Sequence, residues 1–325
     1  MRDRRKPRLL NVIMLILTAA LAVSCFFLPV PEEDLTGSIV SVTWLSDVLS
    51  LLSLTAVAIS AGLLNYRSFL FTSDTQRLFL PYLIVVLSVP GVLSFGLYHI
   101  AALLEVWAMF FAIGYVNSEL RRMDYAFLSL IAAGAASMMV PPLVYVELLV
   151  FLYCLYKRNQ SPLKYLLAAL AGAALPWLYL LAWSFIFPES LSIKDFLTVF
   201  GQGAALSLPD VKGLNGIGAA WCAVGVLLVL RTSAFVLARR RERNKAQKNA
   251  FGLSVALSII SLLAAVFCGM LSEPLFIMAA AVPVSFTAFD LFTNGTRVES
   301  GLWITLLLVL AAAQRVLDFF PGVLS

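Results

Sequence analysis

The run YAFLSLIAAGAASMMVPPLVYVELLVFLYCLY, from Tyr125 to Tyr156, decides how the chain is organised. Its 32 residues could form one long tilted helix, but basic residues flank both ends, with RR before it and KR after it. Lys and Arg concentrate on the cytoplasmic side of a membrane, so both ends are expected inside. Pro141 and Pro142 interrupt a helix near the middle. The sequence therefore predicts a short helical hairpin at 125–157, made of helices 125–140 and 143–157 and partly re-entrant.

The composition of the whole chain places it in the membrane class. Apolar residues make up 61% of its 325 residues and charged residues 13%, whereas soluble domains have about 45–50% and about 25%. The apolar runs are continuous rather than alternating, which predicts spanning helices and not barrel strands. A single integral-membrane domain over residues 1–325 is expected. The net charge of +5 is spread over short turns between these runs, which indicates a lipid bilayer as partner and no nucleic acid.

Working outward from the hairpin, the sequence predicts an all-α polytopic transmembrane helical bundle of about 11 spans. The N-terminus is expected inside and the C-terminus outside, because only three of the 23 basic residues then clearly fall outside. Those three are Lys194, Lys212 and Arg315. The predicted spans are 9–30, 43–64, 78–95, 99–117, 125–140, 143–157, 164–187, 216–237, 250–270, 275–292 and 302–318.

The longest stretch outside these spans is the outer loop 187–216. Within it, SLSIKDFLTVF has apolar residues on one side of a helix and the polar pair Lys194 and Asp195 on the other. We expect an interfacial amphipathic segment, with a plain surface loop as the alternative. Lys194 and Lys212 are cations that could bind a lipid phosphate.

Acidic residues gather in the outer half of the predicted bundle. Glu32, Glu33 and Asp34 follow the first span, and Asp47, Glu105 and Glu147 lie one or two turns inside the outer ends of their helices. Carboxylates within a membrane are costly and usually face a cavity or a partner. If they converge, Glu32, Asp47, Glu105 and Glu147 form an outer acidic pocket. The alternatives are a solvated turn at 32–34, a helix cap at Asp47 and a side chain at Glu147 that reaches the surface.

Cofactor motifs are missing from the sequence. It contains one histidine, His99, and no GxSxG, Walker A, HExxH or dinucleotide-binding pattern. The four cysteines lie far apart inside apolar runs, which favours buried thiols over a zinc site or a disulfide framework. No cofactor is evident.

Two resemblances follow from these features. The succession LNYRSFLFTSDTQRLFLPYLIVVLSVPGVLSFGLYHIAALLEVWAMFFAIGYVNSELRRMDYAF, then VPPLVYVELLVFLY, then QSPLKYLLAALAGAALPWLYLLAWSF, resembles an uncharacterised family of bacterial polytopic inner-membrane proteins. This resemblance implies a multi-pass protein of the bacterial inner membrane. More loosely, the layout is similar to the GT-C type multispan glycosyltransferases, which use a polyprenyl-phosphate sugar donor at the outer face. That likeness implies Asp34 or Glu33 as general base or as ligand of a divalent cation.

Three functions compete at this point. The sequence favours a non-catalytic subunit or scaffold of an envelope process, with other envelope membrane proteins as partners and small-residue runs such as AAGAAS for close helix packing. The first alternative is the GT-C-like glycosyltransferase, which requires Asp34, Glu33 and Glu105 to share one pocket with Lys194 or Lys212. The second alternative is a transporter or lipid flippase, which requires polar residues through the full depth of the bilayer.

Overall fold

The computed structural model describes residues 7–25, 42–68, 76–118, 122–157, 162–187, 192–207, 216–239, 241, 243–271, 273 and 275–319. In these residues the chain forms α-helices and one short 3-10 helix, without strands. The elements are α1 (Pro7–Cys25), α2 (Thr43–Ser68), α3 (Gln76–Leu87), α4 (Leu97–Asn117), α5 (Met123–Met139), η2 (Pro141–Leu143), α6 (Val144–Lys157), α7 (Pro162–Ile186), α8 (Ile193–Ala204), α9 (Gly216–Ala238), α10 (Lys245–Phe267), α11 (Phe276–Asn294) and α12 (Arg297–Phe319).

Seven of the described helices are long and apolar enough to cross a membrane. They are α2, α4, α7, α9, α10, α11 and α12. Shorter apolar helices cover Ile16–Cys25, Met123–Met139 and Pro141–Tyr156. The predicted all-α class is confirmed, and this set of long apolar helices is that of a membrane-embedded protein.

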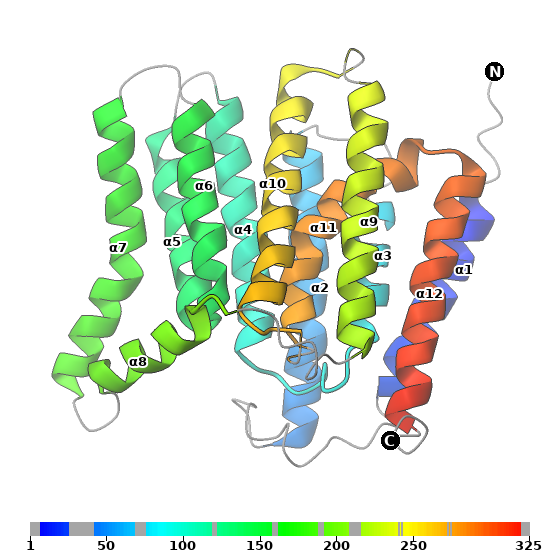
Figure 1. Cartoon of the computed structure of the whole chain (residues 1–325), viewed down its shortest axis with the longest axis horizontal. Helices are drawn as coiled ribbons and strands as arrows, with labels where there is room; N and C mark the ends of the chain where they lie inside the picture. The colour runs from blue at the N-terminus through cyan, green and yellow to red at the C-terminus, as the bar shows by residue number, and fades with distance from the viewer. Residues whose placement is uncertain are drawn as a thin grey trace.

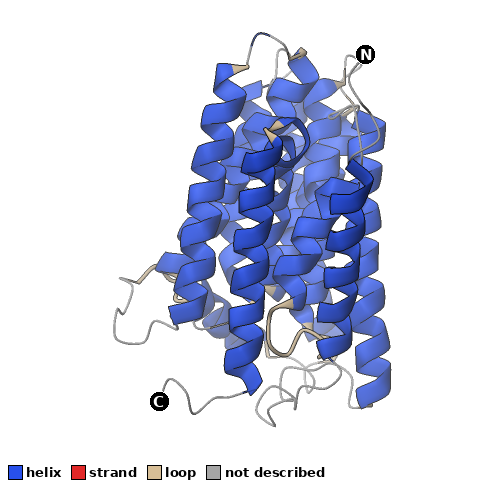
Figure 2. Ribbon diagram, turned by 90° about the vertical axis from the view of Figure 1, so that its right-hand side faces the viewer, coloured by secondary structure: helices blue, strands red, loops and turns tan. Residues whose placement is uncertain are grey.

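The helices run side by side along one direction, except α8, which lies across one end of the bundle (Figure 1). Figure 2 shows the same bundle from the side, with the helices again roughly parallel. We call the end that carries α8 the α8 end. The opposite end carries the end of α4 and the turn from α9 to α10, with exposed basic side chains such as Arg122, Arg239 and Arg241, and we call it the basic end.

The helix α11 is at the centre of the bundle and α7 is at its edge. In α11, 83% of the residues in its membrane-length apolar stretch are buried, because α3, α4, α9 and α10 all pack against this helix. In α7 the corresponding fraction is 11%, and its main neighbour is α5. The other side of α7 exposes large apolar side chains such as Leu178 and Phe185. Such a face suits the hydrocarbon of a bilayer.

Two prolines separate α5 from α6. The helix α5 ends at Met139, η2 contains Pro141 and Pro142, and α6 begins at Val144. The two helices pack against each other, and the Ser129 hydroxyl donates to the Ala108 carbonyl and so links α5 to α4. The proline ring removes a backbone donor and clashes with the preceding turn, so the helix is interrupted here. The proline of α7, Pro176, lies within a continuous helix.

The helix α3 is shorter than the sequence predicts. It ends at Leu87 rather than near residue 95, and a turn of residues 88–96 leads into α4. Gly91 has a φ of 69° in this turn, a conformation that glycine adopts without a steric penalty. Side chains then satisfy the turn, since the Ser50 hydroxyl donates to the Leu93 carbonyl at 2.8 Å. An apolar stretch is therefore a turn here because local backbone and side-chain donors stabilise it.

The only histidine of the chain has a structural place in the same turn. The Gly96 amide donates to His99 Nδ1 at 3.3 Å, and Nε2 lies 2.9 Å from the Val92 carbonyl. With Nδ1 accepting, Nε2 must carry the proton and donate. His99 is 1% exposed. Its ring therefore joins two buried backbone groups of the turn.

The helix α8 packs on α7 and α6 through a few specific contacts. The Trp177 ring of α7 meets Phe200 edge-on at 4.9 Å and Phe196 at 6.1 Å. The Tyr145 hydroxyl donates to the Ala204 carbonyl at 2.7 Å, at the last residue of α8. The polar side of α8, with Lys194 and Asp195, is exposed.

Candidate functional site

The residues at the predicted outer turn lie outside the described part of the chain. These are Glu32, Glu33, Asp34 and Lys212. Their predicted roles in catalysis, in cation binding and in phosphate binding stay predictions. Of the remaining candidates, Asp47 is the fifth residue of α2 and is half-buried, and Lys194 is exposed on α8.

Glu105 lies in the interior of the bundle. It belongs to α4 and is 1% exposed. Neither oxygen of its carboxyl has a hydrogen-bond partner among the described residues. Tyr82 of α3 is close enough to interact electrostatically with Glu105, and its buried hydroxyl likewise has no partner in the described part of the chain. Both groups are thus buried with their hydrogen-bonding capacity unused, which is uncommon.

Glu147 lies at a different helix interface, which α5, α6 and α7 form. The Ser137 hydroxyl of α5 donates to Glu147 Oε2 at 2.9 Å. A methyl group added at Gly134 would lie 3.2 Å from Glu147 Oε1 and 3.4 Å from the Pro176 ring. The described contacts therefore place Glu147 against Ser137 and Gly134.

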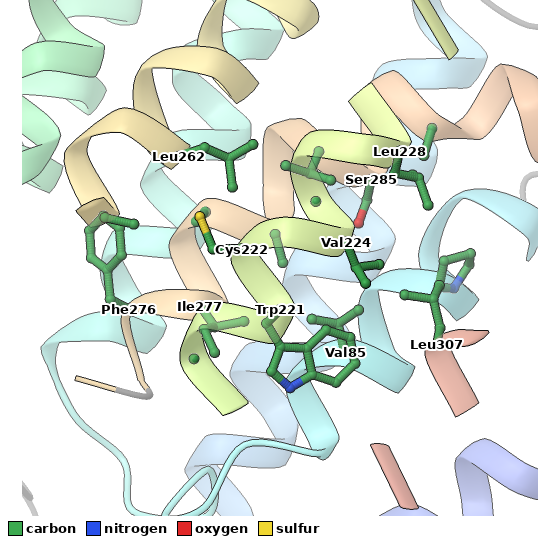
Figure 3. Close-up of a pocket in the computed structure, with 18 of the residues that line it drawn as sticks. Val85, Trp221, Cys222, Val224, Leu228, Leu262, Phe276, Ile277, Ser285 and Leu307 are labelled. Atoms are coloured by element: carbon green, nitrogen blue, oxygen red, sulfur yellow. The ribbon is translucent and has the colours of Figure 1, made fainter. Parts of the chain in front are cut away.

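An apolar groove lies between α3, α9, α10, α11 and α12 (Figure 3). It encloses about 750 Å³ that protein atoms do not fill, including space open to the surroundings. Its walls are almost entirely apolar, with Val85, Leu262, Phe276 and Leu307 contributed by four different helices. We call it the apolar groove.

Two polar groups interrupt the apolar wall. Trp221 of α9 is 6% exposed, and its Nε1 has no hydrogen-bond partner among the described residues. Figure 3 shows the Trp221 ring among the lining side chains, with the Ser285 hydroxyl of α11 farther along the same hollow. Ligand pockets commonly combine apolar walls with a few such groups that fix orientation. The groove therefore suits an apolar guest with at least one hydrogen-bond acceptor.

Glycines of α9 are among the residues that line this groove. A methyl group at Gly225 of α9 would lie 3.2 Å from the Leu262 side chain, and one at Gly218 would lie 2.4 Å from the Leu271 carbonyl oxygen. Glycine at these positions lets α9 approach its neighbours closely, and it places no side chain in the groove. No motif in the sequence singles out Trp221, Cys222 and Ser285. The spaced small residues of GIGAAWCAVG were the available signal, but they do not show which helices face them.

Ser285 also lines a second, smaller hollow of about 230 Å³ between α2, α3, α4 and α11. Tyr82 and Val106 also line this smaller hollow. Val106 is the residue that follows Glu105 in the chain. Ser285 is thus shared by the apolar groove and by the hollow next to Tyr82. The part of the chain that the structure describes holds no group of three or more His, Cys, Asp or Glu residues placed to bind a metal ion.

No family model, curated protein or solved structure matches the chain.

Proposed function

We propose that the chain is a non-catalytic membrane protein that holds the hydrocarbon chain of a lipid in the apolar groove. The groove itself carries this proposal. It lies among helices that are apolar enough to span a membrane, where lipid chains are the surrounding solvent. An unfilled apolar hollow loses dispersion contacts along its whole lining, and a hydrocarbon chain restores them.

The dimensions of the groove support a lipid of one leaflet. The lining residues of α9 run from Gly218 to Leu228, which is roughly 15 Å along a helix axis. This is about half of the ~30 Å hydrocarbon thickness of a bilayer. Trp221 lies five residues after Gly216, the first residue of α9, or roughly 8 Å from the helix start. Its Nε1–H would therefore donate to an ester or phosphate oxygen near the head group.

The proposed orientation has eleven crossings in the bacterial inner membrane, with α8 on the outer surface. The support is the charge asymmetry of the described ends. Arg122, Arg239, Arg241 and Lys248 lie at the basic end, whereas Lys194 lies at the α8 end. Basic residues concentrate on the cytoplasmic side. The N-terminal side of α1 is then inside, the end of α12 is outside, and Trp221 is in the outer leaflet.

A lipid-binding role agrees with the non-catalytic subunit favoured by the sequence. Sugar transfer needs convergent charged groups, and the described acids Glu105 and Glu147 have separate neighbours. The roles of Asp34, Glu33 and Lys212 in that alternative stay predictions.

Native mass spectrometry of the protein released from mild detergent tests this proposal. We expect a bound lipid on the wild-type chain. Cys222→Phe, which fills the groove, should abolish it, and Trp221→Phe should lower the occupancy by up to about tenfold, because one hydrogen bond is lost. The matched control is Leu227→Phe on the same helix, where Leu227 is 54% exposed and outside the groove lining. Equal lipid occupancy in Cys222→Phe and the control would refute the proposal.

A further inference from the structure

We propose that Glu105 is a reversible proton-binding site inside the bundle, with Tyr82 as its hydrogen-bonding neighbour. This inference goes beyond lipid binding and does not depend on it. It assigns a chemical role to a carboxyl group that neither the groove nor the helix packing uses.

The first step is the state of the carboxyl group in this conformation. Glu105 is 1% exposed, and no described residue donates a hydrogen bond to it. It lies eight residues after Leu97, the first residue of α4, and hence roughly 12 Å along a membrane-spanning helix. A bare carboxylate at such a place lacks both water and a counter-ion, which is the most expensive state for this group. The carboxyl group therefore carries a proton here.

The second step is the surroundings of Glu105 on the helices that pack most extensively against α4, which are α2, α5, α6, α10 and α11, in addition to Tyr82 of α3. The described charged groups of these helices lie elsewhere or are engaged. Asp47 is near the start of α2, Asp124 pairs with Arg122, Glu147 bonds Ser137, Lys245 and Lys248 are in the first turn of α10, and Asp290 pairs with Arg243. On α4 itself, His99 is bonded within its turn.

The third step is the room beside the pair. The hollow of about 230 Å³ is lined by Tyr82 and Ser285, and Ser285 also faces the apolar groove. The Tyr82 hydroxyl has no hydrogen-bond partner among the described residues, and it can therefore become a donor to an ionised Glu105. The hydroxyls of Tyr82 and Ser285 can each donate one hydrogen bond and accept another. Two hydroxyl-bearing residues thus line the hollow beside Val106, the residue that follows Glu105, and one of them, Ser285, also lines the groove.

Together these observations fit a group that exchanges its proton rather than one that only fills space. A buried carboxyl with a purely structural role is normally fixed by hydrogen bonds, as Glu147 is by Ser137. Glu105 instead has unused hydrogen-bonding capacity, and so has the hydroxyl of Tyr82, with which it interacts electrostatically. Within membranes, acidic groups of this kind serve as proton relays of pumps and transporters.

Infrared difference spectroscopy between acidic and alkaline buffer, from about pH 5 to about pH 9, tests the proposal. We expect the carbonyl band of a protonated carboxylic acid to disappear reversibly at alkaline pH and to be missing in Glu105→Gln, which keeps the side-chain shape. Glu147→Gln is the matched control and should keep the Glu105 band. A band that persists up to the highest pH at which the chain stays folded would make Glu105 a fixed structural group and overturn the proposal.

Dicyclohexylcarbodiimide provides a second readout, since this apolar reagent adds to protonated carboxyl groups. The intact mass should show one adduct on the wild-type chain, mapped to Glu105, and none there in Glu105→Gln. In Tyr82→Phe, the labelled fraction at alkaline pH should rise by up to about tenfold, because the ionised form loses its donor. Absence of the adduct at acidic pH would contradict a protonated Glu105, and equal labelling in Tyr82→Phe would remove Tyr82 from the site.

Discussion

Arg243 and Asp290 form a buried ion pair that ties the turn after α9 to α11. One guanidinium nitrogen of Arg243 donates to Asp290 Oδ2, and Asn294 donates to the other carboxylate oxygen at 2.8 Å. The side chain of Asp290 is 1% exposed and that of Arg243 is 10% exposed. Because both charges are out of water, each depends on the other, and the basic end of the central helix is held in place.

Loss of the Asp290 carboxylate should therefore be costly. We expect Asp290→Ala to lower the free energy of unfolding by about 3–5 kcal/mol, since a buried charge loses its counter-ion. The control is Glu299→Ala, which breaks the pair of Glu299 with Arg231, whose side chain is 48% exposed. That change should cost about 1 kcal/mol or less. Thermal unfolding in detergent compares the two, and similar losses would contradict the importance assigned to burial.

Gly172 sets the distance between α7 and α5. A methyl group at this position would lie 2.5 Å from the Phe127 carbonyl oxygen, so Gly172→Ala must push the helices apart. We expect a loss of about 1–3 kcal/mol in the free energy of unfolding.

The control for this change is Gly201→Ala on α8, where nothing lies within 4 Å. Alanine should stabilise that helix by roughly 0.5–1 kcal/mol, because glycine loses more backbone freedom on folding. Chemical denaturation measures both variants. Equal and small effects would show that α7 does not approach α5 this closely.

His99 should stabilise the turn between α3 and α4. In His99→Phe the ring volume stays, but the Gly96 amide and the Val92 carbonyl lose their partner. We expect a loss of about 2–4 kcal/mol, from two buried backbone groups left without a hydrogen bond. The control Leu97→Ala alters a side chain that is 44% exposed in the same region. Hydrogen exchange of the turn amides should accelerate in His99→Phe alone, and unchanged exchange would contradict this role.

The proposed orientation predicts which ends are accessible from outside the cell. Single cysteines at Lys194 and at Arg241, both exposed, are placed in a chain whose four native cysteines are changed to alanine. In intact spheroplasts, a maleimide that cannot cross the membrane should label Lys194→Cys and leave Arg241→Cys unlabelled. Both should be labelled after lysis. The reverse pattern would invert the orientation.

The sequence predicted the interruption between α5 and α6, which one local rule decides. Pro141 and Pro142 remove backbone donors, and the helices stop at Met139 and resume at Val144 on either side of them. It erred at α3, where the apolar stretch through residue 95 is no guide to backbone conformation. That helix ends at Leu87, because Gly91 and the side chains of Ser50 and His99 stabilise a turn.

The candidate site was only partly predictable. Glu105 stands out in AALLEVWAMFF because a carboxyl within an apolar run is unusual. Its neighbour Tyr82 lies on another helix, and no spacing in the sequence connects the two. Trp221 and Ser285 are likewise not connected by any spacing in the sequence. They lie 64 residues apart in the chain, yet they line one groove. Only the packing of α9 against α11 brings them to it.

The amino-acid pattern is enough to predict that the chain is all-helical and apolar enough for a membrane, because continuous apolar runs must satisfy their backbone groups internally. Tertiary structure alone decided which helix is central, which is peripheral and where the bundle leaves a hollow. Those properties depend on how side chains from distant helices fill shared space, as Gly225 and Leu262 do at the groove. Packing is a relation between segments far apart in the chain, so no single segment contains it.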